Sequence, residues 1–330
     1  MVRTKIIGLG HAVPDRIVSN SDLENMMDTS DEWITERSGI KERRHVDIGQ
    51  TTSDLAIEAT KMALENSGVK PDEVELIVFC SISSDHFFPG GAVQIQEKLG
   101  MRNIGAFDLR AACSGFIYGL SVADQFIRNG SHKTILLIGA EVQSIALMYD
   151  NDHRDMAVLF GDGAGAAILQ SCEDGSGILS THLHSDGKHI KDLWLPAPGS
   201  SFNPFMSKEL IEQGLHTPSM NGREVFKNAI IRFPEVINEA LKYNNLNIDE
   251  IELVIPHQAN LRITQAVAKR LGINMKKIFS NIEKYGNTTA ASIPIAMSEA
   301  YNEKLFGDGD NIILAAFGAG FTWASAAIKW

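Results

Sequence analysis

The sequence contains few cysteines and no long apolar run without glycine, and both shortages exclude whole classes of protein. Its three cysteines, Cys80, Cys113 and Cys172, include no C-x-x-C pair, so we expect neither a disulfide framework nor a cysteine-based metal site. The uncharged stretch Ile312–Ile328 is interrupted by glycines and is shorter than the roughly 20 apolar residues of a membrane span. Two buried strands around a glycine turn explain it better. The first residues also lack the apolar core of an export signal, so we expect a cytoplasmic protein with no membrane partner.

Basic residues are scarce relative to acidic ones. Lys and Arg number 30 against 41 Asp and Glu, which gives a formal charge of −11. Because nucleic acid is a polyanion, this balance argues against a nucleic-acid partner. The chain is 44% hydrophobic and has 28 glycines among its 330 residues. It can therefore bury a large core, in one large domain or in two smaller ones.

The most informative pattern in the chain is an internal repeat. Residues Asp72–Leu76 read D-E-V-E-L, and residues Asp249–Leu253 read D-E-I-E-L. In each copy a segment with helical periodicity comes before this motif and an apolar strand comes after it. The expected helices are Asp54–Ser67 and Phe233–Tyr243, and the expected strands are Leu76–Cys80 and Leu253–Ile255.

The repeat predicts an α/β protein made of duplicated halves. We assign residues 1–172 to an N-terminal half and residues 173–330 to a C-terminal half. Strands that alternate with helices favour parallel-rich sheets with helices packed on their faces. The halves are expected to stack around a pseudo-twofold axis, and a shared site would then lie at the seam between them.

Three short segments suggest a Cys/His/Asn site for acyl transfer. Cys113 is expected to open the helix Ser114–Arg128, where the positive helix end would favour the thiolate. Asn287 is expected to open the equivalent helix of the other half. An imidazole and an amide can then hold negative charge on a thioester oxygen. The segments are Ala111–Phe116 with Cys113, Pro256–Asn260 with His257, and Tyr285–Ala290 with Asn287.

Other polar or glycine-rich features favour structural explanations. Gly161–Gly165 lacks the lysine of a P-loop and the G-x-G-x-x-G spacing, so a tight turn is expected. The irregular segments Ile145–Asp155 and His184–Ser219 predict mobile flaps. We expect no metal at His182, His184 and His189, because no acidic or cysteine cluster stands at ligand spacing, and we interpret them as flap residues.

Several motifs, taken with their neighbours, closely resemble beta-ketoacyl-[acyl-carrier-protein] synthase III. The resemblance runs nearly end to end. The motifs are Asp28–Ile34 with Arg37–Ile40, Ala111–Cys113, Phe160–Ala166, Pro256–Arg262, Tyr285–Thr288 and Ala316–Trp323.

This resemblance implies a fold and a reaction. The fold would be the thiolase fold, with duplicated α/β halves in a five-layered αβαβα arrangement. The enzyme would be a homodimer that condenses a short acyl-CoA primer, with acetyl-CoA as the first candidate, with malonyl-acyl carrier protein. The product would be a 3-oxoacyl-acyl carrier protein, the start of fatty acid biosynthesis. Acyl-CoA would be a substrate, and no cofactor is implied.

The resemblance also implies roles for individual residues. Cys113 would be the acylated nucleophile, and His257, a neutral donor, would serve decarboxylation of the malonyl group with Asn287. The backbone N–H groups of Cys113 and Ala319 would form the oxyanion hole. The remaining implied residues are Trp33, Arg37, Arg154 and Asn260 for CoA, Phe88 for the acyl pocket across the dimer, and Lys227, Arg262, Lys269 and Arg270 for the carrier protein.

The chain departs from the family pattern at a few positions. Ser114 follows the nucleophile where alanine is common, and Ala319 replaces a frequent glycine. Both changes keep the backbone donors but narrow the site. Arg223 stands where some members carry asparagine near the tunnel, which leaves the details of CoA binding open.

Alternative functions remain at this point. The order of cysteine, histidine and asparagine also resembles papain-like proteases, but Ser114 stands where they carry tryptophan or tyrosine. A polyketide starter synthase or an HMG-CoA-synthase-like enzyme would share the thiolase fold. A noncatalytic acyl-binding protein is the remaining alternative, and the complete triad argues against it.

Overall fold

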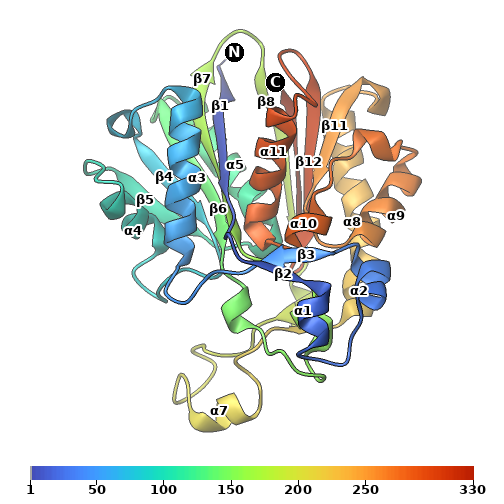
Figure 1. The fold of residues 1–330 in the computed structure, drawn as a ribbon. Helices are drawn as coiled ribbons and strands as arrows, with labels where there is room; N and C mark the ends of the chain where they lie inside the picture. The colour runs from blue at the N-terminus through green and yellow to red at the C-terminus, as the bar shows by residue number, and fades with distance from the viewer. Residues whose placement is uncertain (1) are drawn as a thin grey trace.

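Two β-sheets lie at the centre of the protein, with helices between them and on both outer sides (Figure 1). The computed structural model describes residues 2–330, and Met1 lies outside the described residues. The first sheet contains, in spatial order, β1 (Arg3–Ala12), β7 (Gly163–Cys172), β6 (Thr134–Glu141), β4 (Leu76–Cys80) and β5 (Gly105–Leu109). The second contains β11 (Ile251–Pro256), β12 (Asn311–Gly318), β13 (Thr322–Lys329) and β8 (Gly177–Ser185). Two short pairs also form, β2 (Ile17–Ser19) with β3 (Glu42–Arg44) and β9 (Leu193–Trp194) with β10 (Ser219–Met220).

The second sheet repeats the order and the direction of the first. β8, β13, β12 and β11 take the places of β1, β7, β6 and β4, and in each sheet the equivalent pairs have the same parallel or antiparallel sense. The place of β5 is reduced to one parallel bridge between Val254 and Ile278. The duplication predicted from the sequence is therefore confirmed. β7 ends at Cys172 and β8 begins at Gly177, and the assignment of residues 1–172 and 173–330 to separate domains stays a prediction.

Helices form three layers around the two sheets. α3 (Thr52–Ser67) and α4 (Gly91–Lys98) cover the outer face of the first sheet, and α8 (Gly222–Tyr243) and α9 (Leu261–Leu271) cover the outer face of the second (Figure 1). α5 (Gly115–Arg128) and α11 (Ser292–Asn302) lie between the sheets. One buried apolar cluster lies between each sheet and its outer helices, and a third surrounds the central helix layer and contacts both sheets. The five-layered αβαβα arrangement of the thiolase fold is confirmed.

The smaller helices are α1 (Asn20–Glu24), α2 (Asp31–Ser38), α6 (Arg154–Ala157), α7 (Lys208–Glu212) and α10 (Ile282–Tyr285). Of these, α1, α2 and α7 lie in the lower half of the view in Figure 1. Single 3-10 turns are η1 (Pro71–Glu73), η2 (Ala112–Ser114), η3 (Ser144–Ala146), η4 (Gly187–His189), η5 (Ile248–Glu250), η6 (Met275–Lys277) and η7 (Thr289–Ala291). None of the helices within residues 2–330 combines the length and the apolar character needed to span a bilayer.

The strongest sequence patterns give the observed elements directly. β4 has the predicted bounds, Leu76–Cys80, and every residue in it is buried, as a continuous apolar run in a covered sheet requires. The run Ile312–Ile328 forms β12 and β13 around a glycine turn, as predicted. The repeated acidic motifs form the equivalent turns η1 and η5 ahead of β4 and β11.

Two predictions about the bounds of helices and strands are wrong. α8 begins at Gly222 and not at Phe233, because Asn221 caps its first turn and Pro234 is accommodated inside the helix. His182 and His184 belong to β8 and not to a flap, since that strand continues to Ser185 in pairing with β13. His189, in contrast, lies in the turn η4 between β8 and β9, within the irregular segment where it was predicted.

The tight turn predicted at Gly161–Gly165 is wrong, because β7 already begins at Gly163, and the glycines instead allow a helix to approach this strand. Gly163 and Gly165 lie in β7, where a Cβ atom on Gly165 would meet the Cβ of Pro294 at 2.6 Å and the backbone nitrogen of Ile295 at 2.7 Å. Real Cβ atoms do not approach other atoms so closely. The missing side chain therefore lets α11 lie directly against the first sheet, which fixes the helix start beside the site.

Candidate active site

The three predicted catalytic side chains share one cavity. Cys113 comes from η2, His257 from the segment after β11, and Asn287 from the segment before η7. These segments come from both halves of the repeat. The full lining is Cys113, Leu159, Phe160, Leu193, Met220, Gly222, Val225, Phe226, Ala229, Phe233, His257, Ala259, Asn260, Ile263, Asn287, Phe317 and Gly318.

Cys113 is held by a turn with left-handed backbone. Ala112 has a φ of +45°, a conformation that residues with a side chain rarely adopt. Cys113 follows in η2, directly before α5, and 6% of its surface is exposed. Gly318 lies so close that a Cβ atom there would meet the Cys113 Sγ at 2.9 Å. The thiol is therefore fixed between the start of α5 and the end of β12.

The same turn occurs in the other half, at a slightly different place from the prediction. Thr289 has a φ of +51° and starts η7, and α11 begins at Ser292. The repeat thus matches Cys113 with Ala290. Asn287 lies before the turn and does not open α11. The feature shared by the two halves at this point is the strained turn, and Asn287 precedes it.

Burial dominates the electrostatics of Cys113. Loss of hydration on burial and, to a smaller extent, the buried carboxyl group of Glu141 raise the pKa of its thiol to about 12. Hydrogen bonds from the backbone N–H groups of Ala319 and of Cys113 itself act in the opposite direction. The expectation of a resting thiolate at the helix end is therefore not met. The resting group is a thiol, with two backbone donors directed at its sulfur.

His257 is buried and neutral. Burial lowers the pKa of its imidazole to about 3, and 2% of the residue is exposed. Its Nδ1 lies 2.6 Å from the Oγ of Ser292, while its buried Nε2 has no partner among residues 2–330. The backbone N–H of His257 donates to the carbonyl of Ala315 at 2.8 Å, which continues the pairing of β11 with β12.

Asn287 is oriented by its own turn. The backbone N–H of Thr289 donates to the Oδ1 of Asn287 at 2.9 Å. Because that contact requires an acceptor, the amide oxygen is turned to Thr289 and the NH2 group points elsewhere. The backbone of Asn287 also exchanges hydrogen bonds with Leu159 and Gly161 of the first half, at 2.8 and 3.1 Å. Asn287 therefore joins the two halves at the cavity wall.

Two buried carboxyl groups support the site and were missed in the sequence. Glu141, at the end of β6, is fully buried and accepts hydrogen bonds from the hydroxyls of Ser81 and Ser83 and from the backbone N–H of Ile82. Burial raises its pKa to about 7. Asp162 accepts from the backbone N–H groups of Val46, Gln143 and Ser144 at 2.7–2.9 Å. Glu141 is the last residue of β6 and Asp162 directly precedes β7, so an acidic residue at the boundary of a buried strand is the sequence signal that could have identified both.

A surface groove adjoins the cavity. The two share Leu159, Met220, Gly222, Phe226 and Asn260, so they are continuous. The groove is also lined by predicted CoA residues Trp33 and Arg37 and by Arg223.

Cationic side chains cover the Trp33 ring at the mouth of this groove. The guanidinium groups of Arg37 and Arg154 each lie 4.7 Å from its centre. Asn260 caps α9 and donates from its side chain to the carbonyl of Arg37 at 2.8 Å. The structure thus brings the four predicted CoA residues together. A ring stacking on Trp33 would have to displace one of the arginines.

The remaining predicted residues lie on the surface. Lys227 is on α8, and Arg262, Lys269 and Arg270 are on α9, which packs against α8. Arg262 also lies over the ring of Phe226, a residue of the cavity wall. Phe88 is 81% exposed and does not line the cavity of its own chain.

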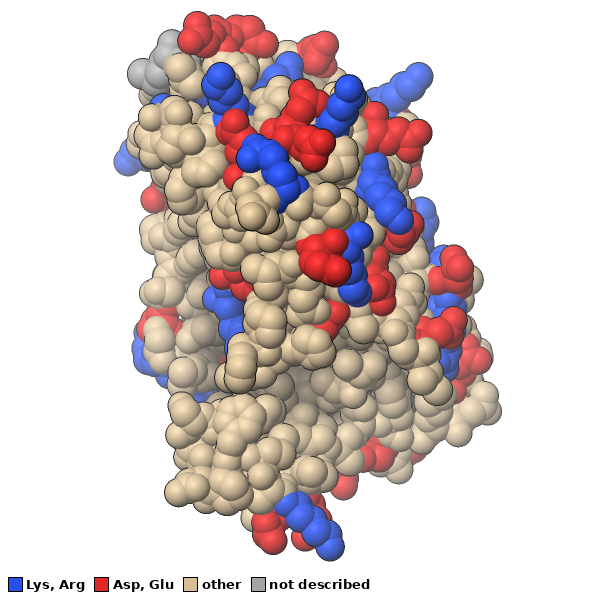
Figure 2. Space-filling model, turned by 90° about the vertical axis from the view of Figure 1, so that its left-hand side faces the viewer, with Lys and Arg blue, Asp and Glu red and all other residues tan. Residues whose placement is uncertain are grey.

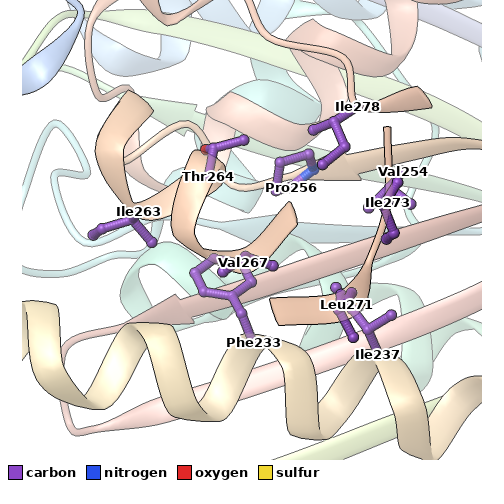
Figure 3. Close-up of a pocket in the computed structure, with 10 residues that line it drawn as sticks. All are labelled: Phe233, Ile237, Val254, Pro256, Ile263, Thr264, Val267, Leu271, Ile273 and Ile278. Carbon is purple, nitrogen blue, oxygen red and sulfur yellow. The ribbon is translucent and has the colours of Figure 1, made fainter. Parts of the chain in front are cut away.

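A second, apolar cavity lies behind the first, between α8, α9 and β11 (Figure 3). Phe233 and Ile263 separate the two and line both. Thr264 supplies the one hydroxyl group of its lining. This cavity is a packing gap of the outer core. Its full lining is Phe233, Ile237, Val254, Pro256, Ile263, Thr264, Val267, Leu271, Ile273 and Ile278.

Comparisons with known proteins identify the family of the chain. The sequence profile described as 3-oxoacyl-[acyl-carrier-protein (ACP)] synthase III matches residues 107–187, and the profile of its C-terminal part matches residues 241–330. Beta-ketoacyl-[acyl-carrier-protein] synthase III of Caldanaerobacter subterraneus is 48% identical, over 98% of this chain and 97% of its own length. The enzyme of Clostridioides difficile is 47% identical, over 98% of each chain. The crystal structure of 3-oxoacyl-[acyl-carrier-protein] synthase III from Aquifex aeolicus superimposes with a TM-score of 0.91 at 42% identity, covering 99% of this chain and 100% of the other. The chain belongs to the beta-ketoacyl-[acyl-carrier-protein] synthase III family.

Proposed function

We propose that this protein condenses a short acyl-CoA primer, with acetyl-CoA as the first candidate, with malonyl-acyl carrier protein, and so starts fatty acid biosynthesis in the cytoplasm. The observation that carries the proposal is the single cavity that joins Cys113, His257 and Asn287 and opens into the groove of Trp33 and Arg37. A buried thiol at the end of a channel suits attack on a thioester that enters from the surface.

In the first half-reaction the sulfur of Cys113 attacks the primer thioester. The developing oxyanion would accept hydrogen bonds from the backbone N–H groups of Cys113 and Ala319, which already point at the sulfur. In the second, the malonyl group loses carbon dioxide, and the enolate oxygen would accept hydrogen bonds from His257 and Asn287. The carbanion then attacks the acyl group on Cys113.

The groove and its surroundings support the proposed substrates. Trp33, Arg37, Arg154 and Asn260 would bind the nucleotide end and pantetheine arm of CoA, since cations and an aromatic ring suit a phosphorylated nucleotide. Arg223, which lines the same groove, adds another cation. On α8 and α9, Lys227, Arg262, Lys269 and Arg270 would attract an acidic carrier protein despite the net negative charge of the chain.

An exposed face beside α4 and β5 supports a homodimer. β5 is an edge strand of the first sheet and offers unpaired backbone groups. Phe87 and Phe88, which shortly precede α4 in the chain, are 64% and 81% exposed. Figure 2 shows that the lower part of this side of the molecule has few charged side chains and is hollowed. A second copy would cover these groups, and its Phe88 would complete the acyl pocket of the first.

Two substitutions test the roles of the nucleophile and the amide. We expect Cys113→Ser to abolish both acylation by labelled acetyl-CoA and condensation. Asn287→Ala should keep acylation but lower decarboxylation of malonyl-acyl carrier protein about a hundredfold, because loss of one oxyanion donor typically costs about 3 kcal/mol. Protein-bound label and released carbon dioxide are the measurements.

These assays also separate the alternative functions. An Asn287→Ala enzyme that releases carbon dioxide at the normal rate would contradict the assignment of the amide. Wild-type protein that takes no label from acetyl-CoA or from longer and branched acyl-CoAs would instead be an acyl-binding protein. A polyketide starter synthase would take other primers preferentially, so a panel of acyl-CoAs is included.

A further inference from the structure

The imidazole of His257 is held by a hydroxyl group that the sequence motifs do not include. Ser292 is the first residue of α11, and 2% of it is exposed. Its Oγ lies 2.6 Å from the Nδ1 of His257 and 3.0 Å from the carbonyl oxygen of Thr289. On the other side of the imidazole, the buried Nε2 has no partner among residues 2–330. Because Nδ1 is turned to Ser292, Nε2 is the ring nitrogen left for the cavity.

Ser292 has one hydroxyl proton, so its Oγ can donate either to the carbonyl of Thr289 or to the Nδ1 of His257, but not to both. If the hydroxyl donates to the Thr289 carbonyl, its oxygen accepts from an Nδ1–H, and two hydrogen bonds form. If it donates to Nδ1, the contact with Thr289 is lost and a buried Nε2–H remains without an acceptor. The first arrangement makes one more hydrogen bond and leaves only a lone pair unsatisfied. Hydrogen bonding therefore places the resting proton of His257 on Nδ1.

We propose that Ser292 is a positioning residue that keeps this proton on Nδ1, so that the lone pair of Nε2 receives the thiol proton of Cys113 during acylation. The inference rests on the proposed function, since it concerns the acylation step of that reaction. It also changes the expected role of His257, which cannot be a neutral donor at Nε2 in this tautomer.

The protons balance in both half-reactions. In acylation the S–H bond of Cys113 breaks and an Nε2–H bond forms, and the departing CoA thiolate then takes that proton. In condensation Nε2 takes up one solvent proton, delivered as hydronium, when the negative charge of the entering malonyl carboxylate stabilises the imidazolium, and it donates a hydrogen bond to the enolate oxygen. When the new carbon–carbon bond forms and Cys113 leaves as a thiolate, the same proton returns to sulfur. The complete reaction thus consumes one proton, which replaces the lost carboxylate charge.

Nitrogen NMR of the wild-type protein tests the tautomer directly. With ¹⁵N-labelled histidine, the His257 signals are those that change when iodoacetamide alkylates Cys113. We expect Nδ1 to resonate as a protonated imidazole nitrogen and Nε2 as an unprotonated one. A protonated Nε2 in the resting enzyme would overturn the proposal, and this test needs neither a variant nor turnover.

The variant Ser292→Ala tests the functional consequence. Without the hydroxyl, the Nε2–H tautomer should appear in the spectrum, and acylation of Cys113 by acetyl-CoA should slow at least tenfold, part of the roughly hundredfold or larger effect of general base catalysis. Decarboxylation by enzyme that has already been acylated should slow much less, because an Nε2–H is the form that donates. Equal losses in both steps, or an unchanged tautomer, would show that Ser292 has only a structural role.

The same helix provides a matched control. Ser298 of α11 is also buried, and its Oγ lies 2.8 Å from the Nδ1 of His11. Ser298→Ala should alter the His11 signals and leave the His257 tautomer and both rates unchanged. Wild-type protein that is not acylated at all would refute the proposed function, while the NMR result would still decide the tautomer.

Discussion

Glu141 is the residue whose charge should affect Cys113 most directly. The carboxyl group is fully buried at the end of β6, its pKa is raised to about 7 by burial, and its charge raises the pKa of the Cys113 thiol. Glu141→Gln removes that charge and keeps one oxygen for the surrounding donors. We expect the thiol pKa of Cys113 to fall, so that iodoacetamide alkylates it faster at a given pH.

The pH dependence of this effect has a defined sign. Below about pH 7 Glu141 is protonated and neutral in the wild type, so the two proteins should react at similar rates. As pH rises through about 7, the Glu141 carboxylate forms in the wild type and disfavours the thiolate of Cys113. The variant lacks this charge, so its alkylation should become progressively faster than that of the wild type. Alkylation of the Cys113 peptide, followed by mass spectrometry, measures the two rates. A rate ratio that stays constant from pH 6 to pH 9 would contradict the coupling.

At the scale of elements, the contact of α11 with β7 sets the geometry of the site. Gly165→Ala would place a Cβ atom 2.6 Å from Pro294, so the helix must shift. We expect a loss of about 1–3 kcal/mol in the free energy of unfolding, the usual effect of overpacking, together with slower condensation because α11 carries Ser292. Thermal unfolding and the condensation assay measure these changes.

Gly187→Ala is the matched control for this substitution. A Cβ atom at Gly187 would have no neighbour within 4 Å, and its backbone is not left-handed. The control should unfold at the wild-type temperature and keep full activity. Should Gly165→Ala also unfold with the wild type, the close packing would not be what positions α11.

Sequence patterns predicted the elements that depend on local apolar periodicity. β4, the pair β12 and β13, and the repeated order of strands follow from buried runs and matching motifs. His182 and His184 were placed in a flap because a strand with polar residues between apolar ones gives a weak signal. The roles of Gly163 and Gly165 depend on which helix lies above them, which no local pattern contains.

The candidate site also contains residues that the sequence predicts and residues that only the structure reveals. Cys113, His257 and Asn287 stand in distinctive motifs, so the sequence predicts that they lie together, and the structure places them around one cavity. Ser292 and Glu141 act through contacts between segments that are distant in the sequence. Ser292 lies 35 residues after His257, and Glu141 accepts a hydrogen bond from Ser83, beyond the end of a neighbouring strand. The protonation state of the Cys113 thiol also cannot be predicted from the sequence. Burial raises the thiol pKa and backbone donors lower it, and the extent of burial depends on the packing of the whole chain.

At the scale of the whole molecule, the two halves differ at one edge. The first sheet ends in the open strand β5, whereas the second has only the bridge at Ile278 in the equivalent place. Open edges pair readily with another strand. The repeat is therefore symmetric inside the protein but asymmetric at its surface, and this favours one dimer interface, on the side of the first sheet.

Phe88→Asp should disrupt that dimer. In a twofold interface each substitution occurs twice, so two carboxylates would be buried without partners, and we expect dimer affinity to fall at least tenfold. Sedimentation equilibrium measures the mass, and condensation should fall with it because the acyl pocket would lose the partner's aromatic ring. Met275→Asp is the control, since Met275 is 39% exposed and follows α9 on the other side of the molecule. A Phe88→Asp protein that remains dimeric at wild-type concentrations would place the interface elsewhere. A wild type that sediments as a monomer would contradict the proposed dimer, because Phe88 would then have no partner subunit whose acyl pocket it could complete.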